Sequence, residues 1–431
     1  MMKKRMLVLA VLCMLLLLCA CSSNSYRVGA AMVDITPEGS ITIAGNTEPA
    51  PASKVDFPLY VKAVVIEAGK EQVAIVTIDT LKYPVGLVEE AMKEIEKQTG
   101  IPADHITITA SHTHSGPHYA DYNGALTQIM ADAVKAAKKD MEPCKLGVAS
   151  AHVEGASHCR RILIDGEAWN DWMVSMPQAW HFYPAVSEID PDVMTIAAVD
   201  KDGNFKTILW NYACHANSNI AGTISADYPG RVQAYVQEML GSDVPLLFLT
   251  GACGNVNANN STESVGSEIG EKIIDCLLNL TYIEDVSIST QTEILELEGR
   301  ENPVFNEEEI AEKWPDQLES YRRNFESTLN KKGTTRTYLC GIAFGKTAAI
   351  ITNPGELFSD YGLAIKEASP FAYTIVTEQT NGAIGYVPTV ADFDLHGYET
   401  WFGEHSNLCA EAGDLIEESS NEILNALYGG E

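Results

Sequence analysis

The sequence is poor in basic residues: 29 lysines and arginines stand against 59 aspartates and glutamates, and the net charge at pH 7 is -30. A field of that sign repels a phosphate backbone, so nucleic acid is not expected as a partner. Low-complexity tracts are absent, and 46% of the residues are hydrophobic, which excludes a disordered or collagen-like chain. The 431 residues therefore predict a globular protein with a sizeable core.

The signature motifs of several enzyme classes are missing as well. The chain has no G-x-S-x-G, H-E-x-x-H, Walker loop or G-x-G-x-x-G. It has no C-x-x-C either, and the seven cysteines beyond residue 21 are widely spaced and odd in number. This pattern predicts buried apolar thiols rather than a disulfide framework or a zinc ribbon.

The N-terminus has the features of an export signal. Three basic residues precede an apolar run over 6–18, which is shorter than the roughly 20 residues of a membrane-spanning helix. The chain then reads LCAC and SSNS, which resembles the lipobox of bacterial lipoproteins. The resemblance predicts a signal peptide over 1–20, a lipidated Cys21 with a tether over 21–25, and an exported cell-surface lipoprotein anchored to a membrane. A plain cleaved signal peptide with an incidental cysteine is the alternative.

Beyond the tether, apolar runs and helical periodicity alternate. Runs typical of buried strands lie at 59–67, 73–78, 106–110, 193–199, 207–212 and 246–250, with helical patterns at 85–99, 126–141, 229–240 and 264–278. This alternation predicts an α/β fold whose mixed sheets are covered by helices on each face. Later segments predict an exposed strand at 282–298, a charged helical excursion on the surface at 306–331, a strand pair within 338–351 and a terminal helix at 407–427. Without a linker or repeat, one domain is predicted over 26–429.

Polar residues follow several of the predicted strands. Residues 106–117 read ITITASHTHSGP, which places His112 and His114 at the rim of a sheet, where sites of α/β proteins lie. They are either metal ligands, one ligand with a hydrogen-bonded neighbour, or surface histidines. His215 ends another strand and is a ligand or a structural histidine, while Glu356 follows an apolar strand in NPGE. Two histidines and a carboxylate would satisfy a catalytic zinc site, but spacing alone leaves open whether they meet.

Two further segments each have two interpretations. The Gly-rich TGACGNVN at 250–257 follows a buried strand and is either an anion cradle made of backbone amides or a tight turn into a helix. The aromatic segment 162–191 either forms the wall of a pocket for an acyl chain or sugar ring, or packs against its own domain.

Together these motifs resemble the catalytic domain of the neutral (non-lysosomal) ceramidases. The resemblance rests on GAAMVDITP at 29–37, SHTHSGP at 111–117, an Arg-Arg pair at 160–161, NYACHANSN at 211–219, TGACGNVNAN at 250–259, NPGE at 353–356, NGAIGYVPT at 381–389 and the segment 398–405. It implies a ceramidase-like α/β catalytic domain. Since the chain stops soon after the last motif, no C-terminal immunoglobulin-like domain is expected.

The resemblance also implies a set of site residues. The zinc ligands that it implies are His112, His215, Glu356 and Tyr386, with His114 as the alternative to His112. The catalytic groups that it implies, for stabilising an oxyanion or passing a proton to the leaving amine, are His114, Arg160 and Tyr398. Arg161 is the second candidate for the family's arginine and a substrate-binding candidate. Asn257 stands where ceramidases have a serine, which excludes a serine nucleophile there and makes Asn257 a substrate-binding candidate.

The implied activity is zinc-dependent hydrolysis of an amide (N-acyl) bond by an activated water. The partners would be a small-molecule or lipid amide substrate and a membrane surface reached through the lipid anchor. Asn257 and the expected lack of a second domain leave two alternatives. One is the same metal-hydrolase scaffold acting on a non-ceramide amide or ester, and the other is a non-catalytic ligand-binding surface lipoprotein. The sequence does not indicate an oligomeric state.

Overall fold

The computed structural model describes residues 25–45, 51–219, 221–330 and 333–429. The predicted signal peptide, Cys21 and all of the predicted tether except its last residue lie outside these ranges. Within them, no helix combines the length and the hydropathy that crossing a bilayer requires.

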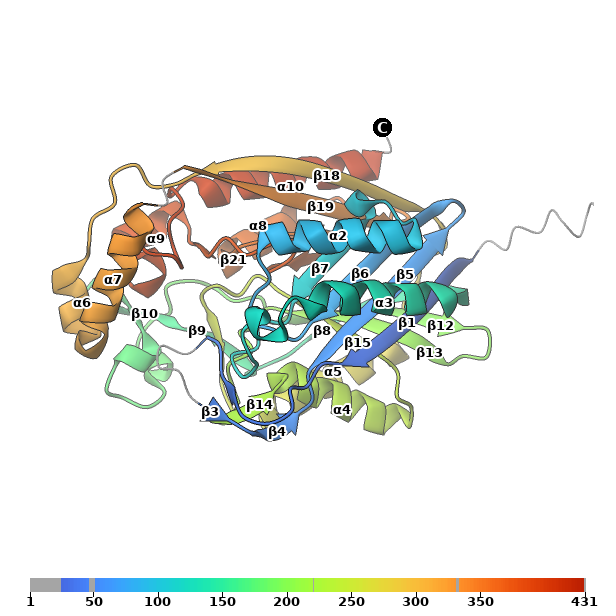
Figure 1. Ribbon diagram of the computed structural model, residues 1–431, viewed down its shortest axis with the longest axis horizontal. Coiled ribbons are helices and arrows are strands. Elements are labelled where there is room, and N and C mark those ends of the chain that lie inside the picture. The colour runs from blue at the N-terminus through green and yellow to red at the C-terminus, as the bar shows by residue number, and fades with distance from the viewer. Residues whose placement is uncertain (1–24, 46–50, 220, 331–332, 430–431) are drawn as a thin grey trace, which may run out of the picture.

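The centre of the molecule is a mixed sheet of nine strands (Figure 1). The order is β15-β13-β12-β8-β1-β5-β6-β7, and β17 pairs with β8. The bounds are β1 Tyr26–Asp34, β5 Tyr60–Ala68, β6 Glu71–Ile78, β7 Ile106–Ala110, β8 Glu142–His152, β12 Asp192–Asp200, β13 Phe205–Tyr212, β15 Leu246–Thr250 and β17 Thr281–Tyr282. The pairs at the two edges, β6 with β7 and β13 with β15, are parallel, and the inner pairs are antiparallel.

A second sheet and two groups of helices complete four layers. The second sheet has the order β18 (Ile288–Glu298), β19 (Thr334–Phe344), β20 (Ala348–Thr352) and β22 (Tyr373–Thr377). Helices α2 (Val85–Thr99), α3 (Ala125–Lys139), α4 (Asp227–Leu240) and α5 (Thr262–Leu278) pack on the central sheet, while α8 (Ser359–Ala368) and α10 (Ala412–Gly429) pack on the second. The layer order is therefore helices, sheet, sheet, helices.

The side chains of a strand point alternately to its two faces, and strand β5 shows how this produces the layers. On β5, Val64 and Ile66 pack into the core between the two sheets, whereas Val65 packs toward α2 and α3. The prediction of an α/β fold with mixed, helix-covered sheets is confirmed. However, one face of the central sheet is covered by the second sheet rather than by helices. An apolar run shows that both faces of a strand are buried, but it does not show what buries them.

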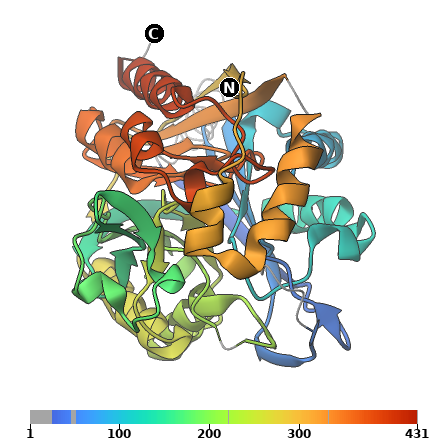
Figure 2. The ribbon, with the colours of Figure 1, turned by 90° about the vertical axis from the view of Figure 1, so that its left-hand side faces the viewer.

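Two other segments differ from their predicted form. The terminal helix begins at Ala412 rather than at 407. The charged stretch at 306–331 forms α6 (Glu307–Lys313) and α7 (Leu318–Leu329), separated at Pro315. Figure 2 shows this pair lying across the end of the molecule where the chain's green and red segments meet. It is anchored there because Ile310 and Tyr321 are buried in a cluster with Trp401.

Short elements complete the chain. The strands are β2 (Ile41–Thr42), β3 (Pro51–Ala52), β4 (Lys54–Phe57), β9 (Ser157–Cys159), β10 (Arg161–Ile164), β11 (Glu167–Asn170), β14 (Thr223–Ser225), β16 (Val256–Ala258), β21 (Glu356–Leu357) and β23 (Tyr386–Val387). The helices are α9 (Val390–Leu395) and the 3-10 turns Ala103–His105, Tyr119–Tyr122, Asp171–Met173, Ala179–His181, Pro315–Gln317 and Tyr398–Thr400. The seven cysteines in the described residues are free, and all but Cys409 are buried, as predicted.

The central sheet curls until its two edge strands approach each other at their C-terminal ends. There the Thr250 hydroxyl, on β15, donates to the Ala110 carbonyl, on β7, over 3.0 Å. The end of β22 and the residues after it form bridges with both edges: Thr377 pairs with Gly251, after β15, and Thr380 pairs with Thr109, on β7. Consequently, the residues that follow β7, β13, β15, β20 and β22 gather in one place.

Candidate metal centre

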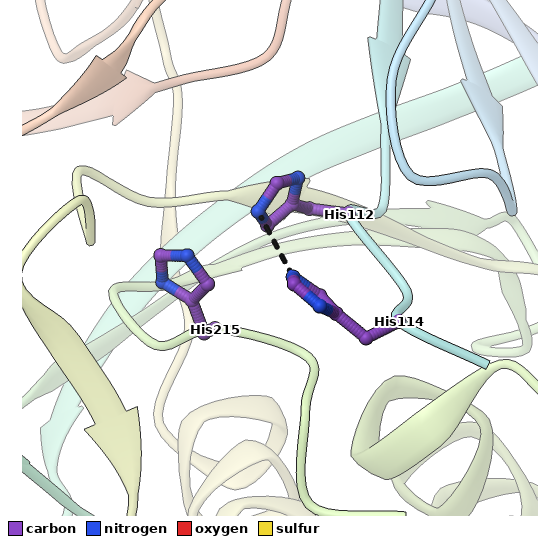
Figure 3. A group of neighbouring side chains, drawn as sticks. All are labelled: His112, His114 and His215. Carbon is purple, nitrogen blue, oxygen red and sulfur yellow. Dashed lines mark hydrogen bonds between the residues drawn. The ribbon is translucent and has the colours of Figure 1, made fainter. Parts of the chain in front are cut away.

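Three histidine side chains meet at this junction (Figure 3). His112 and His114 follow β7, and His215 follows β13. One ring nitrogen from each lies within 4.8 Å of the others. His112 has a positive φ of 59°, an uncommon conformation for a residue with a side chain. Such strain persists where the surrounding structure enforces it, which is typical of functional sites.

Backbone carbonyls determine which nitrogen of each ring carries the hydrogen. Each Nδ1 faces a carbonyl oxygen: that of His112 faces Leu81 at 2.8 Å, that of His215 faces Cys253 at 2.8 Å, and that of His114 faces Gly45 at 3.1 Å. Because a carbonyl can only accept, Nδ1 is the donor and the lone pair lies on Nε2. The Nε2 atoms of His112 and His114 are 3.4 Å apart. Two lone pairs at that distance repel each other unless a cation or a proton lies between them.

Glu356 brings a carboxylate to the same point. Its Oε2 lies 3.6 Å from Nε2 of His112 and 3.5 Å from Nε2 of His215. This buried oxygen makes no hydrogen bond. Strand β21 places Glu356 beside Tyr386 on β23, so the two remaining ligand candidates are backbone neighbours.

Burial and mutual contact set the protonation of these groups. Burial, helped by the charge of Arg160, lowers the pKa of His215 to about 4, and burial also lowers the pKa of His114 well below its usual value. Burial opposes a charge on His112 and on Glu356, but their attraction outweighs it, so the pKa of His112 is raised and the pKa of Glu356 is held well below its usual range. The neutral imidazoles of His114 and His215 and the anionic carboxylate of Glu356 are the forms that a divalent metal binds, whereas His112, whose pKa is raised, would release a proton on binding.

The donor set therefore fits a metal ion. Three converging imidazole nitrogens and a carboxylate oxygen without a hydrogen bond are the ligand types of catalytic zinc sites, and the carbonyls behind the rings are the usual outer partners. The structure thus brings together the predicted ligands His112, His215 and Glu356. Glu356 contacts His112 and His215, and His114 lies 3.4 Å from His112, so these contacts favour His112 over His114 as the ligand.

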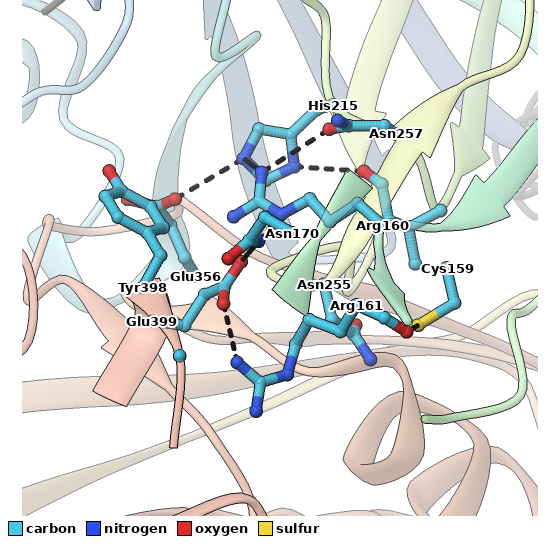
Figure 4. Close-up of polar contacts among 12 residues, drawn as sticks. Cys159, Arg160, Arg161, Asn170, His215, Asn255, Asn257, Glu356, Tyr398 and Glu399 are labelled. Carbon is cyan, nitrogen blue, oxygen red and sulfur yellow. Dashed lines mark hydrogen bonds and ion pairs between the residues drawn. The ribbon is translucent and has the colours of Figure 1, made fainter. Parts of the chain in front are cut away.

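Arg160 lies against the histidines (Figure 4). Its NH1 is 3.2 Å from Nε2 of His215, and its Nε donates to Glu399 over 2.8 Å. The guanidinium lies between two aromatic rings, 5.1 Å from the centroid of Trp172 and 5.3 Å from that of Tyr386. The side chain is only 3% exposed, yet its NH2 makes no hydrogen bond. A buried cationic donor without an acceptor is suited to receive an oxygen atom of a ligand.

The second arginine of the pair does not reach the histidines. Arg161 is fully buried, donates to Glu399 over 2.7 Å and pairs with Asp392 at 3.2 Å. Of the two candidates for the ceramidase arginine, the contacts favour Arg160. Glu399, which also accepts from Asn170 over 2.7 Å, was not predicted. Its importance comes from contacts between positions some 230 residues apart, which a single sequence does not reveal.

Tyr398 lies in an aromatic cluster on the other side of Tyr386. The two tyrosine rings are 5.5 Å apart, and Tyr398 stacks on His405 with centroids at 5.0 Å. Burial raises the pKa of Tyr398 to about 12, so its hydroxyl is protonated at neutral pH. The rings of Trp314 and Tyr321, from the α6–α7 pair, also contact Tyr398. The charged sequence around these two aromatic residues gave no indication of this role.

The Gly-rich segment at 250–257 is a tight turn, because its amides are already engaged. Those of Gly251, Cys253, Gly254 and Val256 donate within the protein. Gly254 approaches the chain so closely that a Cβ there would lie 2.3 Å from the carbonyl oxygen of Glu356. At the end of the turn, Oδ1 of Asn257 accepts from Asn217 over 2.9 Å and from Arg160 over 3.4 Å. Asn257 is thus placed beside Arg160.

Comparison with known proteins identifies the fold. Neutral ceramidase from Pseudomonas aeruginosa matches with a TM-score of 0.71 and 16% sequence identity, covering 94% of this chain and 75% of that one. A ceramidase complexed with C2 matches with a TM-score of 0.70 and 15% identity, covering 94% and 76%. No protein-family model and no curated protein matches the sequence. The predicted ceramidase-like fold is confirmed, and at this level of identity the likeness extends to the fold alone.

Proposed function

We propose that this protein is a zinc-dependent hydrolase that cleaves the amide bond of an N-acyl substrate. The observation that carries the proposal is the buried meeting of three imidazole nitrogens, two of which lie beside an oxygen of Glu356 that has no hydrogen bond. His112, His215, Glu356 and Tyr386 would hold the metal, as the resemblance implies. A zinc ion bound there would supply Lewis acidity, which polarises a carbonyl and acidifies water.

The chain's own residues supply the remaining chemistry. The free NH2 of Arg160 would donate to the substrate carbonyl oxygen, where negative charge develops during attack. The protonated Tyr398 hydroxyl would donate a proton to the leaving nitrogen. His114, which is neutral at pH 7, would accept a proton from the attacking water. Glu399 keeps Arg160 in place by accepting from its Nε.

The surroundings of Arg160 favour an acyl group on the substrate. Trp172, whose ring covers Arg160, is 41% exposed, and Met176 and Phe182 on the same segment are 39% and 71% exposed. Exposed apolar side chains beside a buried polar site suit a ligand with an apolar part. The segment 162–191 would therefore line the acyl side of the substrate.

A second candidate is hydrolysis of an amide or ester other than ceramide. Asn257, at the position of the ceramidase serine, is engaged by both Arg160 and Asn217, so the substrate meets an amide rather than a hydroxyl. The position of the N-terminus also favours this candidate. Strand β1 runs in the same direction as β6 and β7, so it begins at the end of the sheet opposite the site, about 30 Å away for nine extended residues. A lipid anchor at Cys21 would leave the site facing away from its membrane.

Metal analysis and a substrate panel test both candidates. We expect about one zinc per chain in the purified protein, and its loss together with amide hydrolysis in His215→Ala. Turnover of a fluorogenic ceramide compared with short N-acyl amides separates the first candidate from the second. A folded protein with no stoichiometric metal and no turnover would leave a ligand-binding lipoprotein as the better account. Membrane release of a Cys21→Ser variant tests the proposed anchor and export.

A further inference from the structure

A second buried carboxyl group, that of Glu378, lies behind the histidines. Glu378 follows β22, in the segment that bridges the two edges of the central sheet, and its side chain is fully buried. Its backbone amide donates to the Thr250 carbonyl over 2.8 Å, which fixes it to the end of β15. No sequence motif indicated a role for this residue, and none has been given to it above.

The contacts of Glu378 lead to one histidine through a single residue, Cys253. The Cys253 amide donates to Oε2 of Glu378 over 3.0 Å, and the Cys253 thiol donates to Oε1 over 3.1 Å. Nδ1 of His215 faces two carbonyl oxygens, that of Cys253 at 2.8 Å and that of Val256 at 3.2 Å. Glu378 therefore holds the residue whose carbonyl makes the shorter of the two contacts with the His215 ring.

The geometry leads us to propose that Glu378 is a positioning residue for His215, acting through the backbone of Cys253. By accepting from the amide and the thiol of Cys253, it holds that residue in place, so that its carbonyl, in the next peptide unit, helps keep the hydrogen of His215 on Nδ1. Nε2 then points toward His112, His114 and Glu356. This role rests on the proposed metal site, but it is measurable without turnover. Outer partners of metal ligands commonly act in this way.

Three variants test the route. Glu378→Ala removes both acceptors, and we expect zinc affinity to fall by about 10- to 100-fold, the usual effect of losing an outer partner. Glu378→Gln retains the side-chain volume and one acceptor oxygen, so a smaller loss is expected. Cys253→Ala removes the thiol and keeps the peptide amide, so its affinity should stay within about threefold of the wild type. Affinity is measured with zinc alone, by competition with a chromophoric chelator.

Asp190→Asn is the matched control. Asp190 is a buried carboxylate that accepts from a backbone amide, that of Asp192, and pairs with Lys366, but it contacts no residue of the centre. Its replacement should leave zinc affinity unchanged even if the protein is less stable. Equal losses in Asp190→Asn and Glu378→Ala would assign the effect to general destabilisation and overturn the proposal. A loss of zinc affinity in Cys253→Ala as large as that in Glu378→Ala would overturn the proposed action through the Cys253 backbone.

The tautomer of the His215 ring provides a second measurement, which would not change if Glu378 only stabilised the fold. In metal-free protein labelled with ¹⁵N-histidine, His215 should be found as the Nδ1–H tautomer, and Glu378→Gln should shift it toward a mixture of tautomers. An unchanged His215 spectrum together with unchanged zinc affinity in both Glu378 variants would refute the proposal. If the wild type binds no zinc, the proposed function fails, while the tautomer of His215 still decides the role of Glu378.

Discussion

The two halves of the centre differ in how their charges are balanced. The histidine half consists of His112, His114, His215 and Glu356. The arginine half consists of Arg160, Arg161, Glu399 and Tyr398. In the arginine half, the protein supplies the partners: Glu399 accepts from both guanidinium groups within 2.8 Å. In the histidine half, two lone pairs face each other at 3.4 Å, and the Glu356 oxygen between the rings makes no hydrogen bond.

The difference indicates that the two halves are held in place by different interactions. The arginine half forms with the fold, since each buried charge gains a partner as the chain becomes compact. The histidine half is balanced less completely by the chain: NH1 of Arg160 lies against Nε2 of His215, and the attraction of Glu356 raises the pKa of His112, so a bound cation would replace a proton there. The metal should therefore bind at the histidine half, while the stability of the metal-free protein should depend mainly on the arginine half.

The largest effect expected is loss of the metal from the histidine half. His112→Ala removes a ligand candidate that lies against Glu356, so amide hydrolysis should fall by at least about 10⁴-fold with zinc content. His114→Ala should lower turnover and retain the zinc, if His114 is a proton acceptor. Both are measured by metal analysis and steady-state kinetics, with the exposed His152→Ala as control. Zinc lost from His114→Ala and kept in His112→Ala would exchange the two roles.

Breaking the arginine half should instead destabilise the metal-free protein. Glu399→Ala leaves Arg160 buried without its carboxylate partner, which should lower the free energy of unfolding by about 3–5 kcal/mol. Urea unfolding in the presence of a chelator measures this change, with the exposed Glu301→Ala as reference. The folded variant should still bind zinc. Unchanged stability together with lost zinc would contradict the separation of the two halves.

The sequence predicted the histidine half better than the arginine half, for a physical reason. His112, His215 and Glu356 each follow an apolar strand, and strand ends that meet at one sheet edge can be recognised from the pattern of the sequence. Glu399 and the aromatic residues of α6 and α7 reach the site only because distant segments pack together, and no local pattern shows this. The sequence also did not predict that the second sheet covers the central one. Burial on both faces of a strand does not identify whether helices or another sheet cover it.

A pH dependence of stability is expected beside the arginine half as well as in the histidine half, where burial also lowers the pKa of His215 to about 4. Burial lowers the pKa of His405, which stacks on Tyr398, to about 4 from the ordinary 6.5. The unfolded chain therefore takes up the proton first, so stability is fully present above pH 6.5 and is lost as the pH falls toward 4. His405→Asn should remove about 2–3 kcal/mol of this loss from the metal-free protein. Urea unfolding at several pH values measures it, and an unchanged pH slope would refute the assignment.

The smallest effect is expected where the two halves meet. Arg160 contacts both His215 and Asn257, so Asn257 influences the histidine half without belonging to the balanced charges of the arginine half. Asn257→Ser restores the residue expected in ceramidases and removes an acceptor at a partly exposed position, so the free energy of unfolding should change by less than about 1 kcal/mol. The ratio of kcat/KM for a fluorogenic ceramide to that for a short N-acyl amide should rise by up to about tenfold.

The control for this change is Asn260→Ser, at an exposed position, which should leave the ratio unchanged. If Asn257→Ser leaves it unchanged too, substrate choice lies with the apolar segment around Trp172, and Asn257 only supports Arg160.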